Sequence, residues 1–136
     1  IKDIDIIYYD KDDLSVEKDL AYYQEIKKYV DEKGIDYEID VSNEARMHLW
    51  KKENENKHIA QYKNSEDAID QWIATVQSIG ITKEKSEIKI YAPYGLGDIF
   101  SKTIRPIKHK GNSKELYNRK VTSWQNRFKD LIIVEW

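Results

Sequence analysis

The nine residues Ile1 to Tyr9 read IKDIDIIYY and have the pattern of a β-strand. Apolar, mostly β-branched residues alternate with Asp3 and Asp5, which is typical of a strand with one face in a core. Because residues two apart point to the same face, Asp3 and Asp5 should lie side by side, with Ile4 and Ile6 pointing into the core. Neighbouring carboxylates repel each other unless one is protonated or a cation lies between them. A hard divalent cation such as Mg²⁺ or Mn²⁺, which takes oxygen ligands, would satisfy this pair.

The next two predicted elements return the chain to the same sheet. Residues 16–33 have apolar positions at helical spacing, and Gly34 follows where a helix C′ residue belongs. Residues 36–41 read DYEIDV and again alternate, with Glu38 and Asp40 on the polar face. The sequence therefore predicts a strand, a helix and a second strand of the same polarity.

If the two strands are neighbours, Asp3, Asp5 and Asp40 (or Glu38) converge on one point. Three carboxylates around one or two magnesium ions are the arrangement that phosphoryl and nucleotidyl transfer require. The D-x-D spacing alone is a weak signal, because exposed acids on an edge strand have the same pattern.

Further along the chain, two more helices are predicted. Ser42 or Asn43 caps a helix that carries NEARMHLW. A second helix opens at Asn64 or Ser65, carries an apolar stripe, and ends at Gly80. The stripe consists of Ile69, Trp72, Ile73, Val76 and Ile79.

The last third of the chain is predicted to alternate between short strands and helices. Residues 87–92 read as a strand and residues 98–100 as a short helix with Ile99 and Phe100 buried. A basic loop over residues 104–111 precedes a final helix, for which Asn112 and Glu115 resemble a capping box. That helix places Tyr117, Val121, Trp124 and Phe128 on one stripe, and residues 132–136 follow as a final strand.

The composition is that of a folded, water-exposed domain. The 136 residues are 40% hydrophobic and 35% charged, with ten Tyr and four Trp, which excludes a disordered chain. With no Cys, disulfides, zinc–thiolate sites and thiol nucleophiles are excluded. The sequence contains no run of transmembrane length and no signal-peptide pattern, so a cytoplasmic protein without membrane contact is expected.

Charge is distributed unevenly between the two halves. Residues 1–67 carry 18 acidic and 11 basic residues, a net charge of −7. Residues 68–136 carry 7 acidic and 12 basic residues, a net charge of +5. An acidic half and a basic half could serve a site that binds both a metal and a phosphate, although ordinary surface charge is the simpler interpretation.

Four motifs together resemble a known family. They are DIDIIYYD at 3–10, DVSNEARMHLW at 40–50, SEDAIDQW at 65–72 and YAPYGLGDIF at 91–100. In order and in spacing, the chain resembles an uncharacterised bacterial nucleotidyltransferase-like family related to the head domain of CCA-adding enzymes and poly(A) polymerases. NEARMHLW and YAPYGLGDIF are its specific motifs, whereas D-x-D is shared by the wider polymerase-β-like superfamily.

The resemblance implies an α+β nucleotidyltransferase (polymerase-β-like) fold, a small mixed β-sheet flanked by helices. It also implies a magnesium-dependent (or manganese-dependent) site, in which Asp3 and Asp5 match the metal-binding pair and Asp40 the third carboxylate. The Gly-rich turn that cradles the triphosphate in this superfamily is not found in the sequence. Residues 1–136 are thus expected to form a single nucleotidyltransferase-like domain that lacks its N-terminal Gly-rich segment.

Three basic residues are weaker candidates for holding a nucleotide or phosphate. Arg46 lies one turn into the helix after Asp40, where it could reach a phosphate or pair with an acid. Arg105 and Lys108 belong to a basic cluster with Lys110, Arg119 and Lys120. A solvated basic face explains that cluster as well, because the aromatic residues nearby are expected in the core.

Two functions of different classes remain open. The first is an enzyme that moves a nucleoside monophosphate from an NTP to an acceptor hydroxyl of unknown identity, RNA among the choices. The second is a non-catalytic module that keeps the fold and binds a nucleotide or a partner protein. Nucleic-acid binding without catalysis is a third possibility and would show strong salt dependence. The oligomeric state cannot be read from the sequence.

Overall fold

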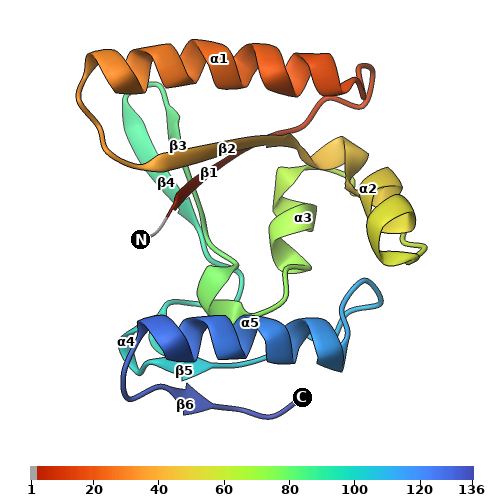
Figure 1. Cartoon of the computed structure of the whole chain (residues 1–136), viewed down its shortest axis with the longest axis vertical. Coiled ribbons are helices and arrows are strands. Elements are labelled where there is room, and N and C mark those ends of the chain that lie inside the picture. Colours follow the sequence, from red (N-terminus) through yellow and green to blue (C-terminus); the bar gives the residue numbers. More distant parts are fainter. Residues whose placement is uncertain (1–2) are drawn as a thin grey trace. The chain divides into compact units, whose positions relative to one another are not determined.

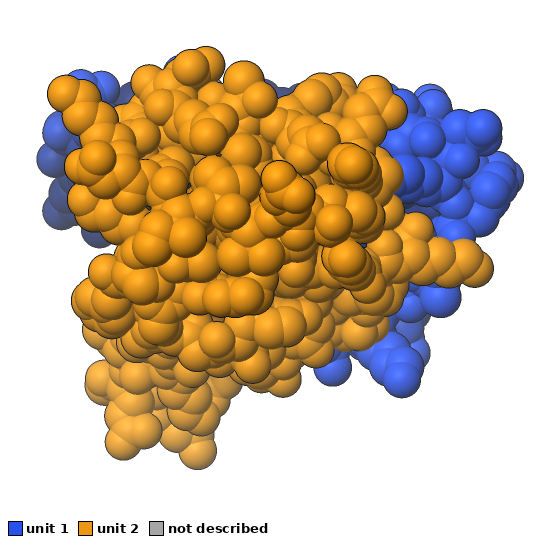
Figure 2. Space-filling model, turned by 90° about the horizontal axis from the view of Figure 1, so that it is seen from below, with its two compact units in different colours: residues 1–65 blue, residues 66–136 orange. Residues whose placement is uncertain are grey.

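The computed structural model describes residues 3–136, which form two compact units (Figure 2). The first unit ends at Ser65 and the second runs from Glu66 to Trp136. Each unit has its own buried residues and is described separately below.

The first unit is built on a parallel pair of strands joined by a helix. Strand β1 (Asp3–Tyr8) is followed by helix α1 (Val16–Glu32) and strand β2 (Glu38–Asn43), which pairs in parallel with β1. Parallel neighbours need a long crossover, and the 17-residue α1 provides it along one side of the pair (Figure 1). Gly34 adopts a φ of +67°, the left-handed conformation expected just after a helix. The predicted strand–helix–strand order is confirmed.

A short 3₁₀-helix and a second α-helix follow β2. The 3₁₀-helix η1 (Glu44–Arg46) leads directly into α2 (Met47–Glu55). Asn43 caps η1, because its side chain accepts a hydrogen bond from the backbone N–H of Ala45. The connection after α2 is tied back to this region, since the Gln61 side chain donates to the Ala45 carbonyl and the Tyr62 carbonyl accepts from the Tyr9 hydroxyl.

The long helix predicted from residue 65 to residue 79 is wrong. Helix α3 (Ser65–Asp70) stops after six residues, and a separate 3₁₀-helix η2 (Thr75–Gln77) follows. Tertiary hydrogen bonds replace the missing helical ones: Asn112 donates to the Gln71 and Trp72 carbonyls. The Ile73 carbonyl likewise accepts from Ile107 N–H, and Thr75 N–H donates to the Arg105 carbonyl. Ile69 and Ile73 are still buried, whereas the other apolar residues of the predicted stripe are only partly buried.

A β-hairpin not fully anticipated from sequence follows η2. Strand β3 (Gly80–Glu84) pairs antiparallel with β4 (Glu87–Tyr91), and only β4 was predicted. Gly80 opens β3 and does not cap a helix. A Cβ at this position would lie 2.6 Å from Ile69 Cδ1, so the close approach of the two segments favours glycine.

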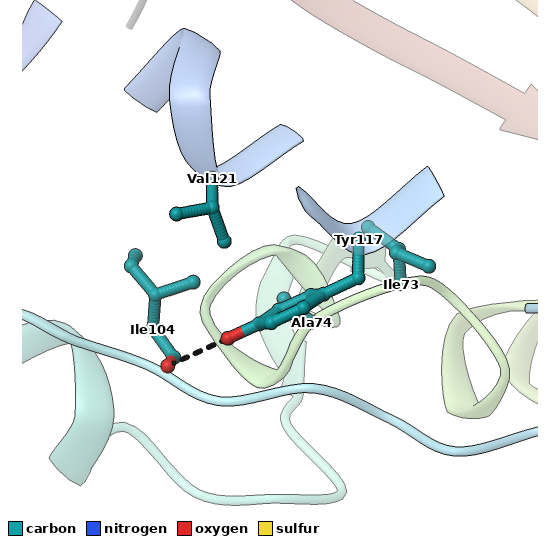
Figure 3. Close-up of a cluster of buried hydrophobic side chains, with 5 residues drawn as sticks. All are labelled: Ile73, Ala74, Ile104, Tyr117 and Val121. Carbon is teal, nitrogen blue, oxygen red and sulfur yellow. Dashed lines mark hydrogen bonds between the residues drawn. The ribbon is translucent and has the colours of Figure 1, made fainter. Parts of the chain in front are cut away.

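The last part of the second unit packs one helix on a short parallel pair. Helix α4 (Gly97–Phe100) precedes strand β5 (Thr103–Ile104), and β5 pairs with β6 (Ile132–Ile133). Helix α5 (Lys114–Arg127) covers them and supplies two members of the buried cluster in Figure 3. The cluster consists of Ile73, Ala74, Ile104, Tyr117 and Val121.

Three local expectations in this part are corrected. Ile99 and Phe100 are 42% and 83% exposed and not buried, because the four-residue α4 is too short to turn both inward. Ser113 caps α5, accepting from Leu116 N–H, since the Asn112 side chain is engaged with the three carbonyls of Gln71, Trp72 and Ile107. Phe128 is 49% exposed, because the helix ends at Arg127 and the backbone turns extended.

Tyr117 connects α5 to both strands of the short pair, and its removal is a direct test of this core. Its single hydroxyl proton is within reach of two carbonyls, that of Ile104 in β5 (3.0 Å) and that of Val134 directly after β6 (2.6 Å). We expect Tyr117→Phe to lower the free energy of unfolding by about 1–2 kcal/mol, because the Val134 carbonyl loses a buried partner. Urea denaturation checks this, with Tyr29→Phe at a 57% exposed position as the control. Equal stabilities of the two variants would contradict the assigned role.

The expected fold class is confirmed as a mixture of helices and small sheets. Within residues 3–136 the strands form three two-stranded sheets, two of them parallel. No helix in this range is long and apolar enough to cross a membrane.

Candidate functional site

Carboxylates line one face of the β1–β2 pair. The register places Asp3 opposite Glu38 and Asp5 opposite Asp40. Residues opposite each other in a sheet point to the same side, so the four side chains share one face, which we call the acid face. All four residues are exposed.

The acid face points away from α1. Tyr8 of β1 donates a hydrogen bond to Asp19 of α1 and packs edge-on against Tyr22, with ring centroids 5.0 Å apart. Tyr8 is an odd number of residues from Asp3 and Asp5, so these acids project from the opposite side of the strand. The carboxylates therefore lie on the open side. The expectation that Ile4 points into a core is wrong, because Ile4 is 38% exposed and Ile6 is only partly buried.

The acid face fits a divalent cation in chemistry and register, but its side chains are not gathered. Carboxylate oxygens from two adjacent strands are the donors that Mg²⁺ and Mn²⁺ prefer. Among residues 3–136, however, no three His, Asp or Glu side chains lie together as a metal-binding group. The roles of Asp3, Asp5 and Asp40 as metal ligands therefore stay a prediction.

Sequence reasoning missed a further carboxylate, Glu44, which directly follows the last residue of β2. Glu44 is only 4% exposed and lies 3.4 Å from the Ser42 hydroxyl, measured to Oε1. Burial raises the pKa of its carboxyl to about 7, and the negative charges of Asp5 and Asp19 raise it further. Glu44 is therefore an acid that takes up and releases a proton near neutral pH.

Arg46 is engaged in an ion pair, which is one of the two roles the sequence left open. Its Nη2 lies 3.3 Å from Oδ2 of Asp19, and both side chains are largely buried. The same Asp19 accepts the Tyr8 hydroxyl, and burial together with this bond raises the pKa of Tyr8 well above its usual value. Buried Nε of Arg46 has no hydrogen-bond partner in the described part of the chain.

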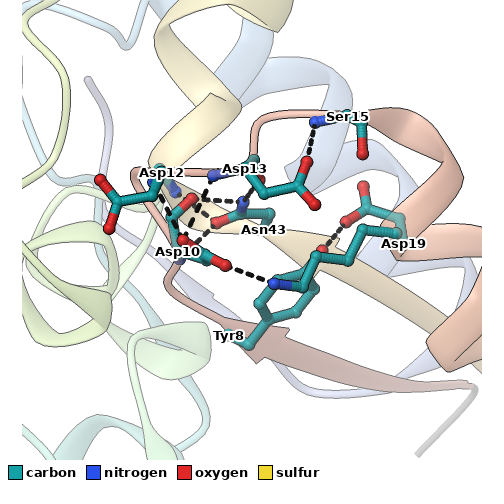
Figure 4. A network of polar contacts seen from close by, with 9 residues as sticks. Tyr8, Asp10, Asp12, Asp13, Ser15, Asp19 and Asn43 are labelled. Atoms are coloured by element: carbon teal, nitrogen blue, oxygen red, sulfur yellow. Dashed lines mark hydrogen bonds and ion pairs between the residues drawn. The ribbon is translucent and has the colours of Figure 1, made fainter.

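Asn43 holds the loop that follows β1. It is fully buried, and its Oδ1 accepts from the N–H groups of Asp10 (3.0 Å) and Ala45 (3.1 Å). Its Nδ2 donates to the carbonyls of Asp10 (2.8 Å) and Asp13 (3.0 Å). Figure 4 shows these bonds converging on one side chain. Asn43 thereby joins the ends of both strands of the acid face to the loop between β1 and α1.

The loop is further ordered by its own acids. Asp10 Oδ1 accepts from the N–H groups of Asp12 and Asp13, and its Oδ2 pairs with Lys18. These contacts hold the pKa of the Asp10 carboxyl below its ordinary value, with the Lys18 bond as the main cause. The Asp10 carboxylate is thus engaged in backbone and ion-pair contacts.

The other two basic candidates belong to the second unit and have partners there. Arg105 Nε lies 3.1 Å from Asp98 Oδ2, which also accepts from the Thr75 hydroxyl. These bonds lower the pKa of Asp98, that to Arg105 most strongly. Lys108 Nζ lies 5.9 Å from the centre of the Trp136 ring, within the range of a cation–π contact. A phosphate-binding role for either residue stays a prediction.

Comparison with known proteins identifies the family. Residues 1–133 match the model of a family described as nucleotidyltransferase. The chain belongs to this nucleotidyltransferase family. One match spans both compact units, and it confirms the family resemblance seen in the four motifs.

A solved structure supports the same assignment. The chain is similar to a protein whose NMR structure is described as revealing a CCA-adding enzyme head domain, with a TM-score of 0.76 and 27% identity. The similarity covers 98% of this chain and 68% of that one. No protein with a curated description matches. The nucleotidyltransferase therefore has the fold of such a head domain.

Proposed function

We propose that this nucleotidyltransferase transfers a nucleoside monophosphate from an NTP to an acceptor hydroxyl, with Mg²⁺ or Mn²⁺ held by Asp3, Asp5 and Asp40. The observation that carries the proposal is the parallel register, in which Asp5 lies opposite Asp40 on the open face of the sheet. Family membership supports the reaction type.

The residues of the acid face would hold the cation between the two strands. When bound there, such an ion would offset the negative charge of the phosphates and lower the pKa of an attacking hydroxyl. In the reaction, a bond forms between the acceptor oxygen and the α-phosphorus, the bond to pyrophosphate breaks, and the acceptor proton leaves to solvent. The pair β1–β2 would keep Asp5 and Asp40 at a set separation throughout.

The carboxylates of the acid face are not gathered into one group, and this favours a second candidate function. Because the described residues hold no ready-made group of three metal ligands, the chain could instead be a binding module that keeps the fold without the reaction. Such a module would bind NTP without a cation at the acid face.

A manganese titration followed by NMR separates the two candidates. Paramagnetic broadening should be confined to residues around Asp3, Asp5 and Asp40 and should disappear in Asp5→Asn/Asp40→Asn. We expect the double variant to lose affinity for Mn²⁺ by about tenfold or more, because a hard cation loses two charged ligands. Asp12→Asn/Asp36→Asn, which neutralises two exposed acids outside the acid face, is the matched control.

Two results would count against catalysis at the acid face. One is equal broadening around every acidic patch, including the loop after β1. The other is NTP binding that is unchanged by chelation of all divalent cations, which would favour the binding module.

A further inference from the structure

The hairpin of β3 and β4 is the longest continuously exposed stretch of the second unit. Within residues 3–136 its strands pair only with each other, and every residue from 81 to 90 is exposed. A two-stranded hairpin is at best marginally stable in water by itself, whereas three or more strands with an apolar face can be stable. Addition of a further strand would therefore stabilise this hairpin.

One face of the hairpin is apolar. The register places Ile81 opposite Ile90 and Lys83 opposite Ile88, so these four side chains share a face. Ile81 and Ile88 are each 72% exposed, and Ile90 is 59% exposed. Adjacent exposed apolar side chains mark surfaces that contact another molecule, unlike apolar residues scattered singly. The three isoleucines therefore indicate an interaction surface.

The outer edge of β4 has backbone groups available for pairing. Lys85 and Ser86 form the turn of the hairpin with φ values of +46° and +71°, as in a two-residue type I′ turn. The pair that closes such a turn is hydrogen-bonded, and hydrogen-bonded pairs alternate with non-bonded pairs along an antiparallel ladder. The N–H and C=O groups of Ile88 and Ile90 therefore point away from β3. In the described part of the chain, no other backbone group bonds to them.

The charges of β4 are complementary to those of a second, antiparallel β4. When Ile88 of two copies face each other, Glu87 of each copy lies opposite Lys89 of the other. Opposite charges across a strand pair are stabilising, and like charges are destabilising. A register centred on Lys89 suits the backbone equally well but opposes two lysines, so charge selects the register centred on Ile88. Lys89 also lies 2.7 Å from Glu84 of its own hairpin, an exposed ion pair that is worth little and leaves ammonium donors free.

We propose that the nucleotidyltransferase self-associates through β4, which pairs antiparallel with β4 of a second copy. The two hairpins then form a four-stranded sheet around a two-fold axis at Ile88. A second copy fits better than a partner with one sign of charge, because residues 81–90 carry three Lys and two Glu in mixed order. The contact involves a small area, so the dimer is weak and transient. The inference goes beyond the proposed reaction and does not depend on it.

Sedimentation equilibrium of the full chain in EDTA, from micromolar to millimolar concentration, measures the association. Glu87→Lys and Lys89→Glu should each weaken dimerisation about tenfold, because each opposes like charges at two places. An equimolar mixture of the two variants should regain the affinity of the unmodified chain, since every lysine then faces a glutamate. The matched control is the mixture of Glu53→Lys and Lys52→Glu, which makes the same charge changes at exposed positions of α2. Neither control variant should weaken dimerisation by itself.

Two further readouts locate the contact on the edge of β4. Ile88→Thr keeps a β-branched residue and should weaken dimerisation about fivefold, because the isoleucine at the axis loses apolar contact with its copy. Ile81→Thr, on the same face and equally exposed but on β3, is the control and should have little effect. Hydrogen exchange of the Ile88 amide should slow as the protein concentration rises. Circular dichroism verifies that each variant is folded.

Several outcomes would overturn the proposal. They are a monomer at every concentration, dimerisation unchanged by Glu87→Lys, equal losses in the β4 and α2 variants, or equal effects of Ile88→Thr and Ile81→Thr. Protection of the Ile88 amide that does not vary with concentration would also overturn it, because the edge would then be covered within one chain. Since the assay contains neither divalent cation nor NTP, its failure is separate from that of the manganese titration.

Discussion

Replacing Asn43 by Ala should lower the free energy of unfolding by about 3–5 kcal/mol, the largest effect we expect from one substitution outside the hydrophobic cores. Asn43 is fully buried and makes four hydrogen bonds to backbone groups. Alanine would leave two N–H groups and two carbonyls without their partner, and each unpaired buried group costs about 1–3 kcal/mol before relaxation and water entry. Urea denaturation followed by circular dichroism measures the loss.

Hydrogen exchange gives a local readout of the same substitution. The amides of Asp10 and Ala45 donate to Asn43, so both should exchange faster in Asn43→Ala than in the unmodified chain. Asn54→Ala is the matched control, because the Asn54 side chain makes one exposed bond, to the Trp50 carbonyl. Unchanged stability with both amides still protected would show that Asn43 does not hold the loop.

Replacing Glu44 by Gln should remove a pH dependence of stability worth about 3 kcal/mol. The pKa of the buried carboxyl is raised from 4.5 to about 7 in the folded chain. The folded state therefore binds this proton more tightly than the unfolded state. The resulting stabilisation is fully present below pH 4.5, is lost as the pH rises to about 7, and stays lost above that value. Glutamine cannot ionise, so the variant lacks this loss.

The measurement is the difference in unfolding free energy between Glu44→Gln and the unmodified chain at about pH 5 and about pH 8, in EDTA. Relative to the unmodified chain, the Glu44→Gln variant should have a higher free energy of unfolding at the higher pH than at the lower pH. Contributions from other groups, such as the Asp98–Arg105 pair, are common to both proteins and cancel. Glu53→Gln, at an exposed position of α2, should show no such change. A difference that is the same at both pH values would mean that Glu44 ionises as an ordinary carboxylate.

The strand–helix–strand beginning of the chain could be predicted because its signals are local. Alternation in β1 and β2, helical spacing in α1 and a glycine at position 34 each report a backbone conformation within a few residues. The stretch from residue 71 to residue 79 could not be predicted in this way. Its carbonyls and amides bond to Arg105, Ile107 and Asn112, which lie about thirty or more positions along the chain.

The features of the candidate site also differ in whether local sequence predicts them. Alternation alone placed Asp3 and Asp5 on one face and Asp40 on the polar face of the second strand. Their pairing register, the burial of Glu44 and the four bonds of Asn43 depend on how β1, β2 and η1 pack. The burial of a single acidic or amide side chain cannot be predicted from the sequence, because one residue forms no periodic pattern.

By itself, the sequence determined the family, the first three elements and the face on which the acids lie, because periodicity and motif spacing are properties of neighbouring residues. Only the tertiary structure decided that Asp5 faces Asp40, that Arg46 is engaged by Asp19, and that Phe128 leaves the core. These outcomes depend on contacts between distant residues. The free energy of such contacts comes from burial and hydrogen bonding in the folded chain, and no short stretch of sequence contains it.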